Sequence, residues 1–175
     1  MQKASSLRGN WQRNVIFLVT ALLVAAADQL SKTWIRSNLA LGQSLPETGF
    51  PRLIHAQNTG SAFGLFQGQS SALIIVAIIG IALILILAFI VYRRSPLLDS
   101  RLGRLALSLI LGGAVGNLTD RLRFGSVTDF IDVGFWPVFN VADSAVTVGV
   151  IIFAYSLLLL ARAEKQGFAE SDRAT

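Results

Sequence analysis

The sequence contains no cysteine, a single histidine and only three lysines among its 175 residues, and only 14% of the residues are charged. The absence of cysteine excludes disulfides, thiolate metal sites and a cysteine nucleophile. One histidine, His55, excludes a metal site with several histidine ligands and the HExxH motif of metallopeptidases. We interpret His55 itself as a surface residue of a loop.

A serine–lysine hydrolase site is disfavoured by the scarcity of lysine. Such a site would have to use Lys32 with the adjacent Ser31, and the side chains of neighbouring helical residues diverge by about 100°. Carboxylates are therefore the groups that remain for acid–base chemistry.

Hydrophobic residues are abundant instead, at 53% of the chain, and they gather in four long runs. Each run approaches the ~20 apolar residues that cross a hydrocarbon core about 30 Å thick. The pattern predicts an all-α membrane protein, a four-transmembrane-helix bundle that forms one domain over residues 1–175. The predicted spans cover residues 15–35, 72–92, 102–119 and 141–161.

The first run has an alternative interpretation as a cleaved signal peptide. Basic residues precede it, and Ala25 to Ala27 resemble a cleavage site. The polar DQLSK sequence that follows and the three further spans favour a retained helix.

Basic residues indicate the orientation of the bundle. Ten of the fifteen lie before the first run, between the second and third, or after the fourth, which is one side of a four-span protein. Basic loops stay in the cytoplasm, so both termini are expected there. Residues 37–71 and 120–140 then face outward, and residues 164–175 form a flexible cytoplasmic tail. The net charge of +5 follows from this orientation and requires no nucleic-acid partner.

The first outer segment is more than a linker. Leu53, Ile54 and residues 62–66 are short apolar pieces separated by proline and glycine, a pattern typical of short strands or turns. We expect them to pack on the outer face of the bundle. No internal repeat is visible, so an inverted-repeat transporter is not indicated.

Six carboxylates fall on the outer side, and four of them have a structural interpretation. Glu47 lies in a turn rich in proline and glycine and is interpreted as solvated, and Asp132 is interpreted as an exposed loop charge. Asp120, directly before an arginine, is expected in a structural ion pair or a helix cap. Asp28 has Lys32 four residues later, so both structural support and a direct role in the site stay open.

Asp143 and Asp129 are the candidates for chemistry. Asp143 stands at the head of an uncharged run, and a charge at membrane depth costs ~2.5–3.5 kcal/mol, which asks for a functional reason. Asp129 lies fourteen positions earlier in a polar, Gly-rich loop. Two close carboxylates share a proton, so one activates water while the other polarises a carbonyl or protonates an amine. Helix capping is the alternative role for Asp143.

Further polar side chains on the same face are suited to positioning a peptide backbone or stabilising charge, and ordinary loop hydrogen bonding is their alternative role. They are Asn58, Asn117, Arg121 and Asn140. In the third run, Gly112 and Gly116 form a small-xxx-small pattern, which favours close helix packing.

Five polar islands, taken in order, resemble those of the lipoprotein signal peptidases, also called signal peptidase II. Together they extend over most of the chain, and the four hydrophobic runs lie in the expected places. The islands are DQLSK at 28–32, NTGSAFG at 58–64, GGAVGNLTDR at 112–121, VTDFI at 127–131 and FNVADSA at 139–145.

The resemblance implies an intramembrane aspartic peptidase of the bacterial cytoplasmic membrane. Its catalytic dyad falls on Asp129 and Asp143, and its supporting residues fall on Asp28, Asn58, Asn117, Arg121 and Asn140. Such enzymes cut diacylglyceryl-modified prolipoproteins just before the lipid-bearing cysteine, need no metal or cofactor, work among membrane lipids and are inhibited by globomycin. The resemblance also implies a small extracytoplasmic β-rich cradle, built from about residues 39–66.

Two other functions compete with this one. A small proton- or ion-coupled transporter would use Asp28 and Asp143 as relay groups, but it predicts acidic residues deeper in the spans. A membrane scaffold would leave the outer polar islands without a purpose.

Overall fold

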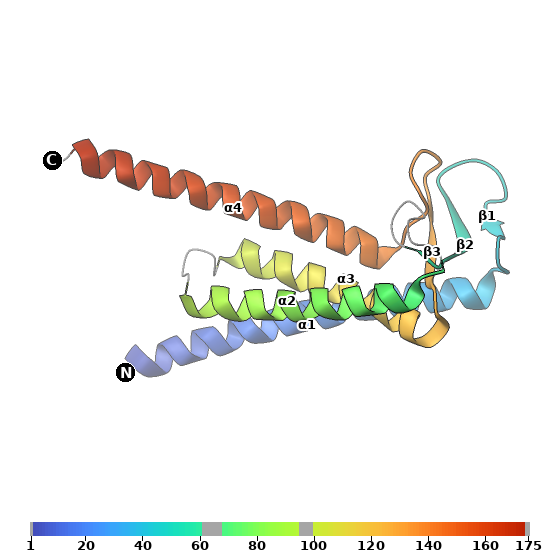
Figure 1. The fold of residues 1–175 in the computed structure, drawn as a ribbon, viewed down its shortest axis with the longest axis horizontal. Helices are drawn as coiled ribbons and strands as arrows, with labels where there is room; N and C mark the ends of the chain where they lie inside the picture. Colours follow the sequence, from blue (N-terminus) through green and yellow to red (C-terminus); the bar gives the residue numbers. More distant parts are fainter. Residues whose placement is uncertain (1, 61–67, 95–99, 174–175) are drawn as a thin grey trace.

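A computed structural model describes residues 2–60, 68–94 and 100–173. Four helices and a small sheet at one end of them make up the fold (Figure 1). The helices are α1 (Gln2–Asn38), α2 (Ser70–Arg94), α3 (Arg101–Phe124) and α4 (Val141–Arg173). The strands are β1 (Ser44–Leu45), β2 (Arg52–Asn58) and β3 (Val127–Asp132).

Each helix contains a stretch that is long and apolar enough to cross a membrane, as the four runs predicted. These stretches are Asn14–Asn38, Ser70–Ile90, Arg101–Phe124 and Val141–Ala163. Helix α4 continues to Arg173, into the segment that was expected to be a flexible tail. It continues because residues 161–166 are the good helix formers Ala, Arg, Glu, Lys and Gln.

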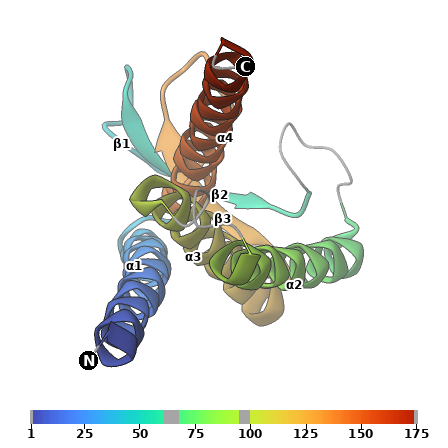
Figure 2. The same cartoon turned by 90° about the vertical axis from the view of Figure 1, so that its left-hand side faces the viewer.

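Helix α3 lies between the other three helices (Figure 2). Its glycines make this possible, because a Cβ at Gly112 would lie 2.6 Å from the carbonyl oxygen of Ala21 on α1. A Cβ at Gly113 would lie 2.5 Å from the carbonyl oxygen of Ala142 on α4. Gly112 thus serves the close helix packing that its spacing from Gly116 predicted.

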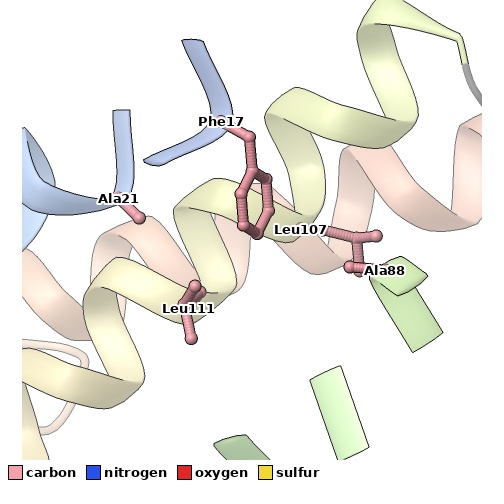
Figure 3. Packing of buried hydrophobic residues seen from close by; sticks show 5 residues of the cluster. All are labelled: Phe17, Ala21, Ala88, Leu107 and Leu111. Carbon is pink, nitrogen blue, oxygen red and sulfur yellow. The ribbon is translucent and has the colours of Figure 1, made fainter. Parts of the chain in front are cut away.

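The apolar core joins α1, α2 and α3 (Figure 3). It consists of Phe17, Ala21, Ala88, Leu107 and Leu111, all at most 7% exposed. By contrast, α2 leaves Val76 63% and Leu83 60% exposed, and exposed apolar side chains of this size suit a helix that faces lipid.

The sheet has the order β1-β2-β3 with antiparallel pairing. Leu53 and Ile54 lie in β2, which confirms a strand in the first outer segment, while the second apolar piece, residues 62–66, falls outside the described residues. Phe130 of β3 packs against Ile35 and Leu39 at the end of α1, so the sheet is fixed to one end of the bundle.

The prediction that Asp129 lies in a loop is wrong, because this residue lies in β3. Gly125, with φ of 71°, ends α3 in the left-handed conformation and turns the chain toward the sheet. The β-branched residues Val127, Thr128 and Ile131 then favour a strand.

Candidate active site

Asp143 lies in the first turn of α4 and takes part in its N-terminal cap. The side-chain Oδ1 of Asn140 accepts a hydrogen bond from the backbone N–H of Asp143 at 2.9 Å. In return, Oδ2 of Asp143 accepts one from the backbone N–H of Asn140 at 3.3 Å. This reciprocal arrangement is a capping box, so the capping role weighed for Asp143 is present and holds the carboxylate at the mouth of the bundle.

Asp129 is 4% exposed, and an amide holds each of its carboxylate oxygens. Nδ2 of Asn140 donates to Oδ1 at 2.7 Å, and Nδ2 of Asn58 donates to Oδ2 at 3.0 Å. Asn58 reaches Asp129 because β2 and β3 are paired, with Ala56 opposite Asp129.

A third amide connects the two carboxylates to α3. Nδ2 of Asn117 donates to Oδ1 of Asp143 at 2.8 Å, and Oδ1 of Asn117 accepts from Nδ2 of Asn140 at 3.2 Å. Asn140, which is fully buried, thus contacts both carboxylates and Asn117. The structure brings together all three asparagines that the sequence singled out.

Burial, followed by the negative charge of Asp143, raises the pKa of Asp129 to about 6. Hydrogen bonds from Asn58 and Asn140 and the charge of Lys32 act in the opposite direction. A raised pKa next to a second carboxylate favours one shared proton on the pair near pH 6. The site thus offers an acid and a base together.

Asp28 connects α1 to the start of α4, next to the two carboxylates. Its Oδ1 accepts from the backbone N–H of Ala142 at 3.0 Å, and its Oδ2 pairs with Nζ of Lys32 at 2.8 Å. The helical pairing of these two side chains was predicted, and between its two possible roles the geometry favours structural support. Arg121 lies at the rim, where it donates to the carbonyl oxygen of Gly60 at 3.0 Å.

Two outer residues are placed differently from their predictions. Asp132 was interpreted as an exposed loop charge, but it is 7% exposed and lies in β3. There its Oδ2 accepts from Nε of Arg52 at 2.8 Å, and this bond lowers the pKa of Asp132. His55 was interpreted as surface, but it is 8% exposed, with Nδ1 2.9 Å from the carbonyl oxygen of Leu39. His55 is buried where the sheet packs on the end of α1, and Asp132 is held by Arg52 of the neighbouring strand.

Asp120 does form structural ion pairs, although its partners are distant in sequence. Its carboxylate lies 3.5 Å from Nζ of Lys32 and 3.5 Å from Nη1 of Arg36. It also accepts a hydrogen bond from the backbone N–H of Thr128 at 2.9 Å. Glu47 is exposed, as expected.

Sequence reasoning missed the central position of Lys32. Its side chain is fully buried, and Nζ contacts Asp28, Asn117 and Asp120. The spacing to Asp28 was the only signal for it in the sequence.

Within residues 2–60, 68–94 and 100–173, no group of three or more His, Cys, Asp or Glu residues is arranged to hold a metal ion.

Comparison with known proteins gives consistent matches. The family model described as signal peptidase (SPase) II matches residues 20–159. A lipoprotein signal peptidase of Dehalococcoides mccartyi is 50% identical over 148 residues, which cover 85% of this chain and 89% of that protein. One from Moorella thermoacetica is 50% identical over 144 residues, which cover 82% and 93%.

Solved structures agree with these matches. A bacterial membrane enzyme determined by the in meso method at 2.3 Å resolution superposes with a TM-score of 0.72 at 29% identity, covering 82% of this chain and 87% of that one. A second such enzyme structure, at 1.9 Å resolution, gives a TM-score of 0.69 at 29% identity, covering 82% and 92%.

Proposed function

This chain belongs to the signal peptidase II family, and from that premise we propose that Asp129 and Asp143 are the catalytic dyad of an aspartic peptidase. Family membership makes it a multi-pass membrane peptidase that removes signal peptides from prolipoproteins. It also decides against the transporter and scaffold hypotheses. The observation that carries the dyad is the shared asparagine, Asn140, which hydrogen-bonds to both carboxylates.

The reaction begins with the shared proton on Asp129, whose pKa is raised to about 6. Asp143 takes a proton from water while the water oxygen attacks the scissile carbonyl carbon. Asp129 gives its proton to the carbonyl oxygen, which produces a neutral tetrahedral intermediate. Asp143 then protonates the leaving nitrogen, the C–N bond breaks, and Asp129 recovers a proton from an intermediate hydroxyl. The dyad returns to its starting state without a covalent intermediate or a metal.

The surrounding residues hold this pair and its substrate. Asn58, Asn117 and Asn140 orient the carboxylates, and Asp28 fixes the start of α4 through Ala142. We assign Arg121 to substrate positioning, because its bond to Gly60 places a cation at the edge of the site.

The substrate is a diacylglyceryl-modified prolipoprotein, cut on the N-terminal side of the lipid-modified cysteine. A signal peptide inserts with its basic end in the cytoplasm, so its cleavage site emerges near the outer surface. With both termini of the enzyme in the cytoplasm, the sheet and the start of α4 lie at that surface, among the lipids that hold the substrate. Globomycin is the expected inhibitor.

The test is processing of a diacylglyceryl-modified prolipoprotein by the purified enzyme, with and without globomycin. Asp129→Asn and Asp143→Asn should each abolish cleavage while the protein still inserts and folds. Asp132→Asn is the matched control, because it makes the same change three residues along β3 and should leave cleavage intact. Full activity of either dyad variant, or cleavage insensitive to globomycin, would refute the proposal.

A further inference from the structure

Lys32 is an ammonium group buried in a membrane-spanning helix, with 0% of its side chain exposed. An isolated charge there is costly, so such groups are paired. Nζ carries three donors, and three acceptors surround it. These acceptors are Asp28 Oδ2 at 2.8 Å, Asn117 Oδ1 at 2.8 Å and Asp120 Oδ2 at 3.5 Å.

Each of these three acceptor residues makes one more hydrogen bond, either to a member of the dyad or to the residue directly before one. Asn117 donates to the carboxylate of Asp143 at 2.8 Å. Asp28 accepts from the N–H of Ala142 at 3.0 Å, directly before Asp143 in the chain. Asp120 accepts from the N–H of Thr128 at 2.9 Å, directly before Asp129. One side chain of α1 is therefore linked to both members of the pair, which lie on different elements.

Lys32 also determines which way the amide of Asn117 points. A lysine ammonium can only donate, so the oxygen of this amide has to face Nζ. The NH₂ group is then directed at the carboxylate of Asp143. The opposite orientation would set the amide oxygen against that carboxylate and the NH₂ group against the ammonium, with both hydrogen bonds lost.

We propose that Lys32 is a positioning residue that fixes the relative placement of Asp129 and Asp143 through Asn117, Asp28 and Asp120. The proposal rests on the proposed function, in which these two carboxylates are the dyad. Lys32 has no direct contact with substrate in this role; it acts through the three residues that it holds.

The charge of Lys32 also acts on the chemistry of the pair. It opposes the rise in the pKa of Asp129 that burial and Asp143 cause. Removing the charge should therefore move the pH profile of cleavage toward higher pH, since the shared proton is then retained to higher pH. The charged groups that face Lys32 or its partners are Asp28 and Arg36 on α1, Asp120 and Arg121 on α3, Asp129 on β3 and Asp143 on α4.

The experiment compares Lys32→Met with Lys165→Met in the prolipoprotein cleavage assay. Lys165 is exposed on the far part of α4, so its variant loses the same charge and side chain away from the site. For Lys32→Met we expect kcat to fall about 100-fold, as for a misplaced catalytic group, with KM within about twofold. Its pH profile should move to higher pH. The control Lys165→Met should match the wild type in kcat, KM and pH profile.

A second variant covers the possibility that Lys32→Met fails to fold. In Lys32→Met with Asp28→Asn one charge of each sign is lost, and the amide oxygen of the new side chain can still accept from the N–H of Ala142. This double variant should fold, remain at least about tenfold slower and show a smaller displacement of the pH profile in the same direction. A folded variant with native kcat, or with reduced kcat and an unmoved profile, would overturn the proposal. Failure of both variants to fold would also overturn it, because Lys32 would then be a folding determinant.

These outcomes are separate from a failure of the dyad itself. If Asp129→Asn or Asp143→Asn cleaves normally, the proposed function is wrong whatever Lys32 does. If both are inactive while the Lys32 variants behave as wild type, only the positioning role is lost.

Discussion

Asn140 has two separable tasks at the scale of a single residue. Its side-chain oxygen caps α4, and its NH₂ group donates to Asp129 at 2.7 Å. Serine is also a good N-cap residue, but it has no amide donor. Substitution by serine or alanine therefore distinguishes the cap from the contact with the dyad.

We expect Asn140→Ala to lower the free energy of unfolding by ~1–2 kcal/mol through loss of the cap, and Asn140→Ser to lower it by less. Both should lose most of their cleavage activity, because Asp129 loses a hydrogen-bond donor in each. Thermal unfolding and prolipoprotein cleavage are the two measurements. A serine variant with wild-type activity would show that the contact with Asp129 is dispensable.

Asp129 is predicted to reduce stability at neutral pH, as the cost of its function. Its pKa rises from 3.8 to about 6 on folding, so the folded state resists ionisation. The cost is fully present above pH about 6 and disappears below the unfolded value of 3.8. At 1.36 kcal/mol per pH unit, the difference corresponds to ~3 kcal/mol as an upper bound.

Asp129→Asn should therefore raise the midpoint of thermal unfolding at pH 8 and raise it less at pH 5. The gain is smaller than the bound, because an asparagine cannot accept hydrogen bonds from both Asn58 and Asn140. The measurement is the midpoint at the two pH values, with Asp132→Asn as control. Since Arg52 lowers the pKa of Asp132, this control should lose stability at pH 8. A destabilised Asp129→Asn at pH 8 would contradict the prediction.

The residues of the site differ in how well their roles could be predicted from the sequence. Asp129, Asp143 and the three asparagines stood out because polar side chains beside apolar runs need a reason to be there. The position of Lys32 did not, since two of its three contacts lie on α3, more than eighty residues away in the chain. His55 and Asp132 were misplaced for a similar reason: His55 contacts the end of α1 and Asp132 pairs with an arginine of β2, both contacts between separate elements of the fold.

At the scale of elements, the close approach of α3 and α4 sets the distance between Asn117 and Asp143. Gly113 makes this approach possible, and a Cβ there would meet the backbone oxygen of Ala142, which cannot move aside like a side chain. Gly80 on α2 has nothing within 4 Å of its Cβ position. The two glycines are therefore a matched pair for testing helix contact.

We expect Gly113→Ala to destabilise the protein by ~1–3 kcal/mol and to reduce cleavage strongly, because α4 is displaced together with Asp143. Gly80→Ala should be neutral or stabilising by up to ~1 kcal/mol, from the better helix propensity of alanine. Thermal unfolding and cleavage of both variants give the answer. Equal behaviour of the two variants would contradict a role for the glycine contact.

Helices were predicted better than strands, because a membrane span meets the same lipid environment along its whole length. Lipid requires an unbroken apolar helix, so all four spans could be found from composition. Strand β3 was missed because its six residues, VTDFID, carry two aspartates, which strands usually avoid. Pairing with β2 and contact of Phe130 with α1 compensate for this composition.

At the scale of the whole molecule, orientation follows from basic residues, and the structure explains the five that were assigned to the outer side. Each has a local partner, which offsets its charge or holds its side chain. The pairs are Lys32 with Asp28, Arg36 with Asp120, Arg52 with Asp132, Arg121 with Gly60 and Arg123 with Phe124. The other ten lie at the opposite ends of the spans, and we expect them to keep both termini in the cytoplasm.

The absence of cysteine makes this orientation directly measurable, because a single introduced thiol has no background. Glu47 and Lys165 are both exposed and lie beyond opposite ends of the spans. In intact spheroplasts a membrane-impermeant maleimide should label Glu47→Cys and leave Lys165→Cys unlabelled until the membrane is permeabilised. Labelling in the reverse order would place the sheet and both aspartates in the cytoplasm. A prolipoprotein's cleavage site would then lie across the membrane from the dyad, so this result would refute the proposed reaction as well as the topology.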